Sequence, residues 1–352
     1  MNTAEQIRVA IIGCGLIGTE WDRTTPANAP ALTHARAYSQ HRRAKLMAIC
    51  DRDEERARSA AEYWRVAHTY SDPKQLFAEQ KIDVAVISAS SSSRWDVIEP
   101  ALEACVKVLV IEKPLATSLK ESRRLVAAID AAGAFSVVNY SRNWDPSMRD
   151  LKVRIAAGDM GKVQRVVAIY GKGIGNNGSH LIDITGFLCD ARPVRARALG
   201  SPLEASEAAW SLTGERAWDA QVEFIDANGV SINLTLLGTN QHAFTCFELK
   251  IIGNKAIFEF SMGGRRLNWF KLQDDPNFTG YVVPAPAVAL PSHYLEAMQV
   301  MTDEVLQLAA GDITSVSCNV HTALRTALVV EAIQLSAKGD GQWIALDTLY
   351  NE

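Results

Sequence analysis

The stretch Ile7-Arg-Val-Ala-Ile-Ile-Gly-Cys-Gly-Leu-Ile-Gly18 decides the fold of this chain. Residues 7–12 form a short, nearly continuous apolar run, which is typical of a buried parallel strand. The glycines that follow have the GxGxxG spacing of a dinucleotide-binding turn. There the first glycine allows a sharp turn, the second lets a pyrophosphate approach the backbone, and the third lets the next helix pack closely. The candidate cofactor-binding residues of this loop are Gly13, Gly15, Leu16, Ile17 and Gly18.

Strands and helices alternate over the first 135 residues. Apolar runs that read as buried strands recur at residues 45–50, 83–88 and 106–111. Helical patterns lie between them, at 53–64, from the Asp72-Pro73 pair onward, and from Ser118 to a stop at Gly133. Alternation of this kind indicates βαβ units and a doubly wound parallel sheet. We therefore expect an α/β fold in which residues 1–135 form an NAD(P)-binding Rossmann domain.

Asp51 ends the second predicted strand. A carboxylate at this point accepts hydrogen bonds from the ribose hydroxyls of an adenosine, and it repels a 2′-phosphate, which favours NAD over NADP. Arg52 leaves NADP open, because its guanidinium could serve that phosphate. Alternatively, Asp51 could only cap the next helix. The distance from Gly18 to Asp51 is long because Thr19–Leu32 resembles an insertion, after which the first helix resumes near Thr33.

The pattern changes after residue 135. A strand at 135–138 and a helix at 146–157 lead into strands at 221–225, 230–237, 247–252, 256–260 and 266–272. The turn Asp226-Ala-Asn-Gly229 is a hairpin signal, so we expect an antiparallel meander. Residues 136–352 should form an α+β domain for substrate binding and oligomerisation on an open, mostly antiparallel sheet. Helices at 294–309 and 320–337 either cover this sheet or return to the first domain.

The same strands are apolar on both faces: Phe247, Leu249 and Ile251 alternate with Ile252, Ile257 and Phe258. A sheet that faced solvent on one side would alternate apolar with polar residues. We therefore expect the open sheet to form a homodimer or homotetramer interface.

Composition narrows the class of protein. The chain has 352 residues, 36 Lys and Arg, 40 Asp and Glu, and a net charge of −4. This mild acidity provides no field for capturing nucleic acid or an anionic membrane, and the apolar run at 9–12 is too short for a signal or a membrane span. Six dispersed cysteines predict reduced thiols and a cytoplasmic protein. No metal site is expected, because neither the cysteines nor His34, His41, His68, His242, His293 and His321 have ligand spacing.

Two further motifs complete a pattern. Glu112-Lys-Pro114 follows the fourth clear strand, and Gly178-Ser-His-Leu-Ile-Asp183 comes some sixty-five residues later. With the glycine loop, these motifs resemble the family of glucose–fructose oxidoreductase, inositol dehydrogenase and the rhizopine catabolism protein. The resemblance implies a Rossmann domain, an open-sheet domain that commonly mediates dimers or tetramers, and NAD(P)-dependent oxidation or reduction of sugars, polyols or nucleotide-linked sugars.

The resemblance also implies roles for single residues. Lys113 would lie beside the nicotinamide ribose and the substrate hydroxyl, with Pro114 often in a cis peptide. His180 and Asp183 would lie at i and i+3 on one helix face that looks back at the cofactor. Histidine titrates near neutral pH, so we expect His180 to act as the base and Lys113 to hold the substrate oxygen. Further candidates are Ser88, Ser90 and Glu112 for the cofactor, and Asn139, Tyr140, Arg142, Asn176 and Asn177 for the substrate.

The chain departs from the family pattern at two places. Many members carry an aspartate where this chain has Asn176, and without that carboxylate Lys113 could itself become the base. The stretch after the third Rossmann strand is often Thr-Pro-Asn with a following histidine, but here it is Ala89-Ser-Ser91 with Arg94. The favoured activity is a dehydrogenase or reductase acting on a secondary hydroxyl of a small sugar-like substrate. The alternatives are a glycosidase that uses NAD for transient oxidation, and a non-catalytic sugar or cofactor sensor.

Overall fold

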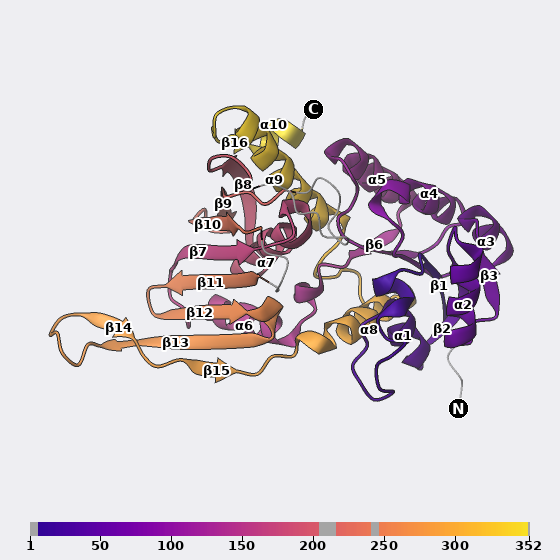
Figure 1. Ribbon diagram of the computed structural model, residues 1–352, viewed down its shortest axis with the longest axis horizontal. Helices are drawn as coiled ribbons and strands as arrows, with labels where there is room; N and C mark the ends of the chain where they lie inside the picture. Colours follow the sequence, from indigo (N-terminus) through magenta and orange to yellow (C-terminus); the bar gives the residue numbers. More distant parts are fainter. Residues whose placement is uncertain (1–5, 204–215, 241–245, 351–352) are drawn as a thin grey trace. The chain divides into compact units, whose positions relative to one another are not determined.

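The computed structural model describes residues 6–203, 216–240 and 246–350, which fall into two compact units (Figure 1). Unit 1 consists of Met1–Asp145 and Leu295–Leu324, and unit 2 of Pro146–Tyr294 and Arg325–Glu352. The division thus lies ten residues beyond the boundary expected at 135, and a late segment of the chain belongs to the first unit. His242 lies outside the described residues.

Unit 1 contains six parallel strands in the order β3-β2-β1-β4-β5-β6. The strands are β1 (Ile7–Ile12), β2 (Ala44–Cys50), β3 (His68–Tyr70), β4 (Val84–Ile87), β5 (Val108–Ile111) and β6 (Phe135–Val138). This order reverses direction between β1 and β4, and ligands of doubly wound sheets bind in the crevice at that switch point, beyond the carboxyl ends of the strands. The predicted Rossmann sheet is confirmed, although β3 was not expected from the sequence.

Six helices accompany this sheet: α1 (His34–Gln40), α2 (Glu54–Trp64), α3 (Pro73–Glu79), α4 (Trp95–Glu103), α5 (Leu119–Ala132) and α8 (Ala297–Ala310). The start of α5 is capped as expected, because Ser118 accepts the amide of Glu121, and Gly133 ends the helix in the left-handed conformation. Helix α8 contacts α1, β1 and β5. Of the two late helices, α8 therefore packs on the first unit, while α9 (Val320–Lys338) runs through the division at residue 324.

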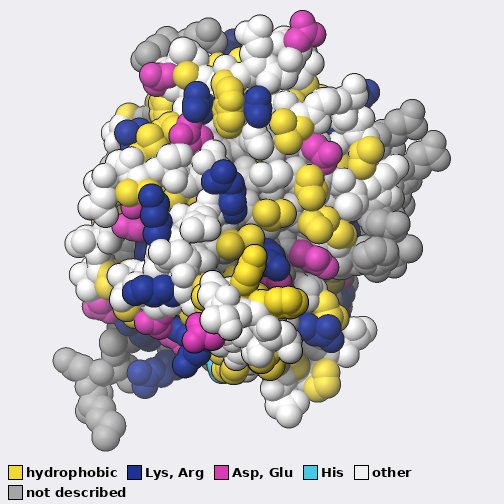
Figure 2. Space-filling model, turned by 90° about the vertical axis from the view of Figure 1, so that its left-hand side faces the viewer, with side chains coloured by type: hydrophobic (Ala, Val, Ile, Leu, Met, Phe, Trp, Pro, Cys, Tyr) yellow, Lys and Arg dark blue, Asp and Glu magenta, His cyan; other side chains and the backbone are white. Residues whose placement is uncertain are grey.

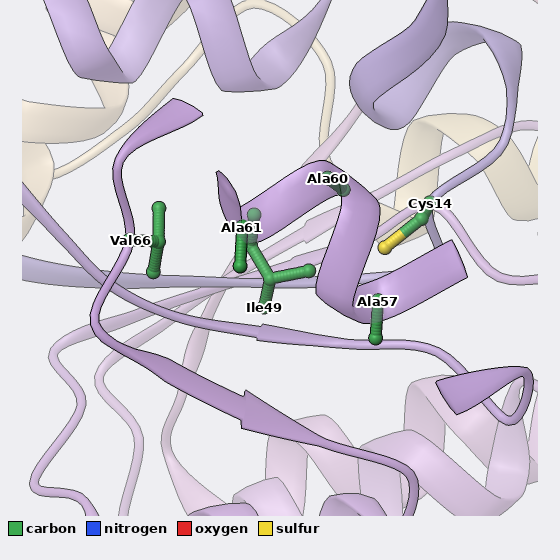
Figure 3. Packing of buried hydrophobic residues seen from close by; sticks show 6 residues of the cluster. All are labelled: Cys14, Ile49, Ala57, Ala60, Ala61 and Val66. Atoms are coloured by element: carbon green, nitrogen blue, oxygen red, sulfur yellow. The ribbon is translucent and has the colours of Figure 1, made fainter. Parts of the chain in front are cut away.

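The core beneath α2 explains the cysteine in the glycine loop. Figure 3 shows the alanines of α2 directed at Ile49 of β2 and at the side chain of Cys14, with Val66 beside them. Burial, together with the nearby carboxylate of Asp51, raises the pKa of the Cys14 thiol far above its usual range. Cys14 is therefore a small apolar packing residue, as was expected for the buried thiols.

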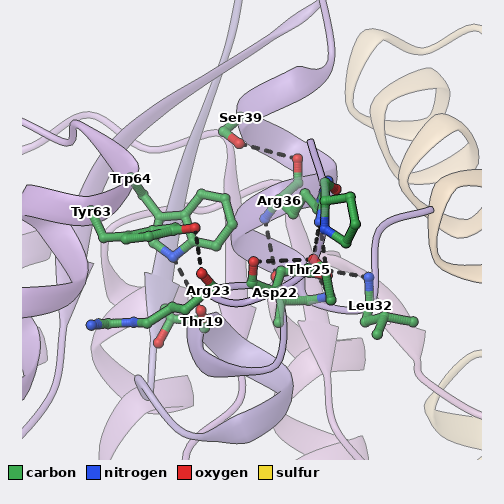
Figure 4. Close-up of polar contacts among 11 residues, drawn as sticks. Thr19, Asp22, Arg23, Thr25, Leu32, Arg36, Ser39, Tyr63 and Trp64 are labelled. Atoms are coloured by element: carbon green, nitrogen blue, oxygen red, sulfur yellow. Dashed lines mark hydrogen bonds and ion pairs between the residues drawn. The ribbon is translucent and has the colours of Figure 1, made fainter. Parts of the chain in front are cut away.

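The segment between the glycine loop and α1 is held by buried polar groups (Figure 4). Asp22 accepts hydrogen bonds from the amides of Leu32 and Thr33, at 2.9 and 2.7 Å, and forms an ion pair with Arg36 at 3.2 Å. Burial alone would raise the pKa of Asp22, but the hydrogen bonds from Thr33, Leu32 and Thr25 lower it. Thr33 caps α1 by accepting the amide of Arg36, so the helix resumes where the sequence predicted.

Unit 2 contains a ten-stranded sheet in the order β14-β13-β12-β11-β7-β10-β9-β8-β16, with β15 paired to β13. Its strands are β7 (Val163–Tyr170), β8 (Ala191–Ala198), β9 (Ala220–Asp226), β10 (Ser231–Gly238), β11 (Phe247–Gly253), β12 (Ala256–Ser261), β13 (Arg266–Asp274), β14 (Val282–Pro284), β15 (Val288–Leu290) and β16 (Ile344–Ala345). Its helices are α6 (Pro146–Ala156), α7 (Ser179–Cys189), most of α9, and α10 (Leu346–Tyr350).

One detail of the predicted meander is wrong. Strand β7 lies between β10 and β11, antiparallel to β11 and parallel to β10, so the sheet is mixed. A parallel neighbour has no turn that marks it in the sequence, because its partner is distant along the chain. The hairpin β9–β10 and the run β11–β12–β13 are antiparallel as expected.

The two faces of this sheet differ in burial. Phe258 lies on the buried face opposite Ile251, and not on the outer face where the sequence pattern placed it. On the outer face, Ile252 pairs with Ile257, which pairs with Phe270, and all three side chains are partly exposed. Figure 2, which views the left-hand side of Figure 1, shows apolar side chains interspersed with basic and acidic ones.

Two features are absent from the described residues. None of their helices is long and apolar enough to cross a membrane. No cluster of three or more His, Cys, Asp or Glu side chains in these parts of the chain could hold a metal ion.

Candidate functional site

The first and third glycines of the loop are required by the protein's own packing. Gly13 has φ +104°, and a Cβ there would lie 2.4 Å from the amide nitrogen of Ala89. A Cβ on Gly18 would lie 2.2 Å from the carbonyl oxygen of Gly13. Both distances are shorter than any real Cβ contact, so these two glycines let β1, the loop and the strand beside it approach closely.

Gly15 differs from its two neighbours. A Cβ on this residue would meet no atom within 4 Å, and its backbone is in the extended region that any residue adopts. The fold therefore does not need a glycine here, whereas a ligand that approaches the backbone would. Beside it, Leu16 is exposed and Ile17 partly exposed. This open cradle fits the pyrophosphate of a dinucleotide.

The helix after the loop is shorter than a usual dinucleotide-binding helix. Leu16–Glu20 is a single π-helical turn, in which the amide of Trp21 donates to the carbonyl of Leu16 at 3.1 Å. A long helix dipole is therefore absent from this point, and the amides at the start of the turn are what the loop offers to a phosphate.

Asp51 is joined to the glycine loop. Its carboxylate accepts the amide of Cys14 at 2.7 Å and the amide of Asp53 at 3.0 Å. The alternative that Asp51 only caps the next helix is wrong, because Asp53 caps α2 by accepting the amide of Arg56. Each carboxylate oxygen of Asp51 keeps a second lone pair, so the group can still accept ribose hydroxyls. Arg52 is exposed, and the guanidinium of Arg56 lies 3.8 Å from the Asp51 carboxylate.

The two candidate serines after β4 differ. The hydroxyl of Ser88 donates to the carbonyl oxygens of Gly13 at 2.7 Å and Ile12 at 3.2 Å, which joins the β4 loop to the glycine loop. Ser90 is exposed, and its hydroxyl is within 3.2 Å of those of Ser92 and Ser93, in the 3₁₀ turn Ser91–Ser93. Of the two, Ser88 is the one that shapes the loop.

Glu112 organises the segment after β5. Its Oε1 lies 2.9 Å from Nε2 of His34 and accepts the side-chain amide of Asn139 at 2.7 Å. Burial alone would raise the pKa of Glu112, but the hydrogen bond and charge of His34, the hydrogen bond of Asn139 and the charge of Lys113 lower it. Lys113 is half-buried, and its peptide bond to Pro114 is cis, as the resemblance implied.

Unit 2 carries the second set of candidates on one continuous helical segment. A π-helical turn, Ile174–Gly178, contains Asn176 and Asn177 and runs directly into α7. A Cβ on Gly178 would lie 2.7 Å from Cδ1 of Ile174 and 3.2 Å from the ring of Tyr170, so the turn packs closely against these two side chains. His180 and Asp183 are 8% and 5% exposed, and the imidazole of His180 meets the ring of Phe247 edge-on at 6.2 Å.

The structure thus distributes the candidates over both units. In unit 1, the glycine loop, Asp51, Ser88 and Lys113 follow the carboxyl ends of β1, β2, β4 and β5. Asn139, Tyr140 and Arg142 lie buried after β6, where the amide of Asn139 is bonded to Glu112. In unit 2, Asn176, Asn177, His180 and Asp183 lie together at the start of α7.

Sequence reasoning missed three side chains of unit 1. His34 contacts Glu112 across 78 residues of sequence, and its place in the first turn of the helix after the loop was its only signal. Arg56 was not identified because α2 carries several charged residues and nothing in its spacing distinguishes this one. Arg94 appeared only as a departure from the family pattern, yet it is buried and bonded to the Ala89 and Leu115 carbonyls.

Comparison with known proteins agrees with this geometry. Residues 7–140 match the oxidoreductase family with an NAD-binding Rossmann fold. The strand order and the open glycine loop agree with that description, so this part of the chain is a Rossmann domain of the NAD-binding type. The matched model is that of glucose–fructose oxidoreductase, inositol dehydrogenase and the rhizopine catabolism protein, so residues 7–140 are similar to this family, in agreement with the resemblance.

Curated relatives match this chain over about half of its length. NAD⁺-dependent scyllo-inositol 2-dehydrogenase of Bacillus subtilis is 30% identical over 168 residues, which are 48% of this chain and 44% of the relative. D-apiose dehydrogenase of Paraburkholderia graminis is 26% identical over 160 residues, 46% of this chain and 39% of the relative. The matched segments span less than two thirds of these relatives.

Solved structures extend the likeness of fold to nearly the whole chain. An inositol dehydrogenase homologue of Azotobacter vinelandii, crystallised with NADH and myo-inositol, has a TM-score of 0.73 at 18% identity and covers 97% of this chain and 98% of its own. An oxidoreductase of Desulfitobacterium hafniense described as NADPH-dependent reaches 0.77 at 17% identity, covering 99% and 100%. These identities are low, so the comparison establishes the fold of both units and no more.

Proposed function

We propose that the protein is an NAD-dependent oxidoreductase that transfers hydride between the nicotinamide and a secondary hydroxyl or carbonyl of a sugar, polyol or nucleotide-linked sugar. The observation that carries the proposal is the carboxyl edge of the six-stranded sheet. An open cradle at Gly15, a carboxylate at Asp51 and a lysine at position 113 follow three strands of that edge. The names of the matched relatives, dehydrogenases of inositol and apiose, support the substrate class.

In this proposal the residues of unit 1 bind and orient the cofactor. The loop amides receive the pyrophosphate and Asp51 receives the adenosine ribose. Bound NAD supplies the hydride acceptor. The ammonium of Lys113 is the cation available after β5 to hold the substrate oxygen and to stabilise negative charge that develops on it.

The residues of unit 2 move the proton. Oxidation of a carbinol requires the hydroxyl proton to pass to a base. A free imidazole has a pKa near ~6.5, close to working pH, whereas a free lysine starts near ~10.4. We propose His180 as the base, oriented by Asp183 one helical turn later. Lys113 is the alternative base, because position 176 is an asparagine and provides no carboxylate to keep the lysine protonated.

The test is a screen of polyols, hexoses and nucleotide-linked sugars with NAD and with NADP, in which the absorbance of the reduced cofactor measures turnover. Net formation of NADH with a free polyol or sugar supports the proposal. Cleavage of a glycoside without net NADH would identify the glycosidase. Binding of NAD by calorimetry without turnover of any substrate would identify the sensor.

We also propose that the protein is a cytoplasmic homodimer or homotetramer joined through the open sheet of unit 2. The outward ladder of Ile252, Ile257 and Phe270 supports the interface, because an apolar ladder on an open sheet gains by burial against a second copy. The six cysteines, none of which forms a disulfide bond, support a reducing compartment.

A further inference from the structure

Arg94 is a buried cation in unit 1, and the proposed reaction assigns it no role. It lies immediately before α4, and its side chain is 2% exposed. Its hydrogen-bond partners within the described chain are three carbonyl oxygens rather than a carboxylate. A buried guanidinium costs several kcal/mol of desolvation, so its retention here needs a reason.

The three carbonyls belong to two loops. Nη2 donates to the carbonyl oxygen of Ala89, at 3.2 Å, in the loop after β4. Nη1 donates to the carbonyl oxygens of Pro114 and Leu115, the latter at 3.0 Å, in the segment after β5. Because β4 and β5 are parallel neighbours, the guanidinium joins two adjacent loops at the edge where the cofactor binds.

The guanidinium suits this position better than any other side chain. It presents five donors in a rigid planar fork, which can serve several carbonyls at once, while an ammonium is a single point donor. Burial lowers the pKa of Arg94 to about 10, and the nearby Glu112 and Tyr140 oppose this change. Arg94 therefore keeps its charge at neutral pH, and Glu112 partly compensates it.

A continuous set of contacts then links three loops. The hydroxyl of Ser88 joins the β4 loop to Gly13 in the glycine loop. Arg94 joins the same β4 loop to Pro114, the residue after Lys113. On the other side of Lys113, Glu112 is bonded to His34 and Asn139. Lys113 is thus fixed on both sides, by Glu112 before it and by Arg94 after it.

We infer that Arg94 is a positioning residue: it holds the Lys113–Pro114 segment against the β4 loop and so sets the place of the Lys113 ammonium relative to bound cofactor. This inference rests on the proposed function where it concerns turnover. Misplacement of a catalytic group by about 1 Å can cost ~10²-fold in rate. Loss of Arg94 should therefore reduce kcat by that order and change the KM for NAD much less.

The experiment compares Arg94→Ala, Arg94→Lys and a control, Arg58→Ala, which removes an exposed arginine of α2. Each is assayed with the best substrate of the screen, with and without guanidinium at tens of millimolar. We expect added guanidinium to raise the kcat of Arg94→Ala at least about tenfold. Methylammonium should not raise it, and the kcat of Arg58→Ala should respond to neither compound. If folded Arg94→Ala or Arg94→Lys keeps the wild-type kcat, the inference is wrong.

A second measurement needs no substrate. Competitive acetylation followed by mass spectrometry gives the reactivity of Lys113 relative to the exposed Lys81. The inference requires the relative reactivity of Lys113 to change several-fold in Arg94→Lys, and in Arg94→Ala to return with guanidinium. Unchanged reactivity in the folded variants overturns it. If wild type forms no NADH with any substrate, the proposed function fails, while this labelling still decides the role of Arg94.

Discussion

The two units hold their candidate residues in different ways. In unit 1 the candidate side chains bind the backbone of neighbouring loops: Ser88 binds Gly13, Asp51 binds Cys14, and Arg94 binds Ala89 and Leu115. In unit 2 the candidates sit on one helical segment, and the tight packing of Gly178 against Ile174 and Tyr170 sets its path. The candidates of unit 1 thus lie on loops that are joined to one another, and those discussed in unit 2 lie on one continuous helical segment.

Under the proposed function, this difference follows from what the candidate residues of each unit bind. A dinucleotide has a constant pyrophosphate, so the loop that receives it has constant backbone requirements, and glycine is the residue that meets them. A substrate hydroxyl can be received by many side chains on many surfaces. In this proposal the nucleotide site is therefore specified by short sequence motifs, whereas the substrate site depends more on the fold around its motif.

The largest expected effects are on turnover, and the first of them concerns unit 2. His180→Ala should lower turnover by ~10²–10⁴-fold, the usual contribution of a general base, with the affinity for NAD nearly unchanged because the cofactor loops are in unit 1. The kcat and a calorimetric titration of NAD measure the two quantities. His68→Ala, which removes an exposed histidine, is the matched control and should change neither.

Lys113→Ala sharpens the same comparison. Under either assignment of the base we expect it to abolish turnover. If His180→Ala keeps more than half of the wild-type turnover while Lys113→Ala abolishes it, the roles of the two residues are exchanged and Lys113 is the base.

The next effect concerns the folding of unit 1. Gly13→Ala should destabilise the protein by ~1–3 kcal/mol or more, because it adds a Cβ 2.4 Å from a backbone atom at a positive φ. Thermal unfolding followed by circular dichroism would show a fall of several degrees. Gly133→Ala, also at a positive φ but with open space around its Cβ, separates backbone strain from the clash. Equal losses in the two variants would contradict the packing argument.

A smaller effect is expected at the adenosine ribose. Asp51→Asn removes the charge that repels a 2′-phosphate, so the preference for NAD over NADP should narrow by ~10-fold, equivalent to about 1.4 kcal/mol. Calorimetry with both cofactors measures it, and Arg52→Ala is the companion variant. Wild type that binds NADP as tightly as NAD would show that Arg52 or Arg56 governs the site, and not the carboxylate.

The smallest effect on turnover concerns the open sheet, where a substitution should instead change the molecular mass of the assembly. Ile257→Glu puts a charge in the middle of the outward ladder, and it should dissociate the assembly to monomers of 38.5 kDa while the fold is retained. Solution scattering at micromolar concentration reads the mass. Val153→Glu, at an exposed position of α6, should leave the assembly intact. If the wild-type protein is monomeric, the proposal of an interface at this sheet is wrong.

Much of unit 1 could be predicted from the sequence. The strand–loop junction at Gly13 and the cap at Ser118 depend on local residues, whereas the hydrogen bond from the amide of Cys14 to Asp51 joins residues 37 apart and was not predicted. The contact of His34 with Glu112 could not be predicted, because 78 residues separate them and histidine has no spacing rule with a carboxylate. Arg94 was similarly hidden, since backbone carbonyls carry no sequence signal.

Unit 2 was less predictable for a different reason. Its hairpins followed from turn residues, but the place of β7 between β10 and β11 depends on pairing between distant segments. The alternation of Ile251 and Ile252 located two faces correctly, whereas Phe258 was assigned to the wrong one because its register with β11 was unknown. The motif around His180 identified the helix but none of the packing that sets its path.

Gly15 gives the most direct test of the central claim, that unit 1 is built to receive a dinucleotide. Since a Cβ at this position meets no protein atom within 4 Å and its backbone is extended, Gly15→Val should unfold at the wild-type temperature. The same side chain would occupy the space of the pyrophosphate, so calorimetry should show NAD binding weakened at least about tenfold, or 1.4 kcal/mol. Gly15→Val that binds NAD as tightly as wild type would contradict the account.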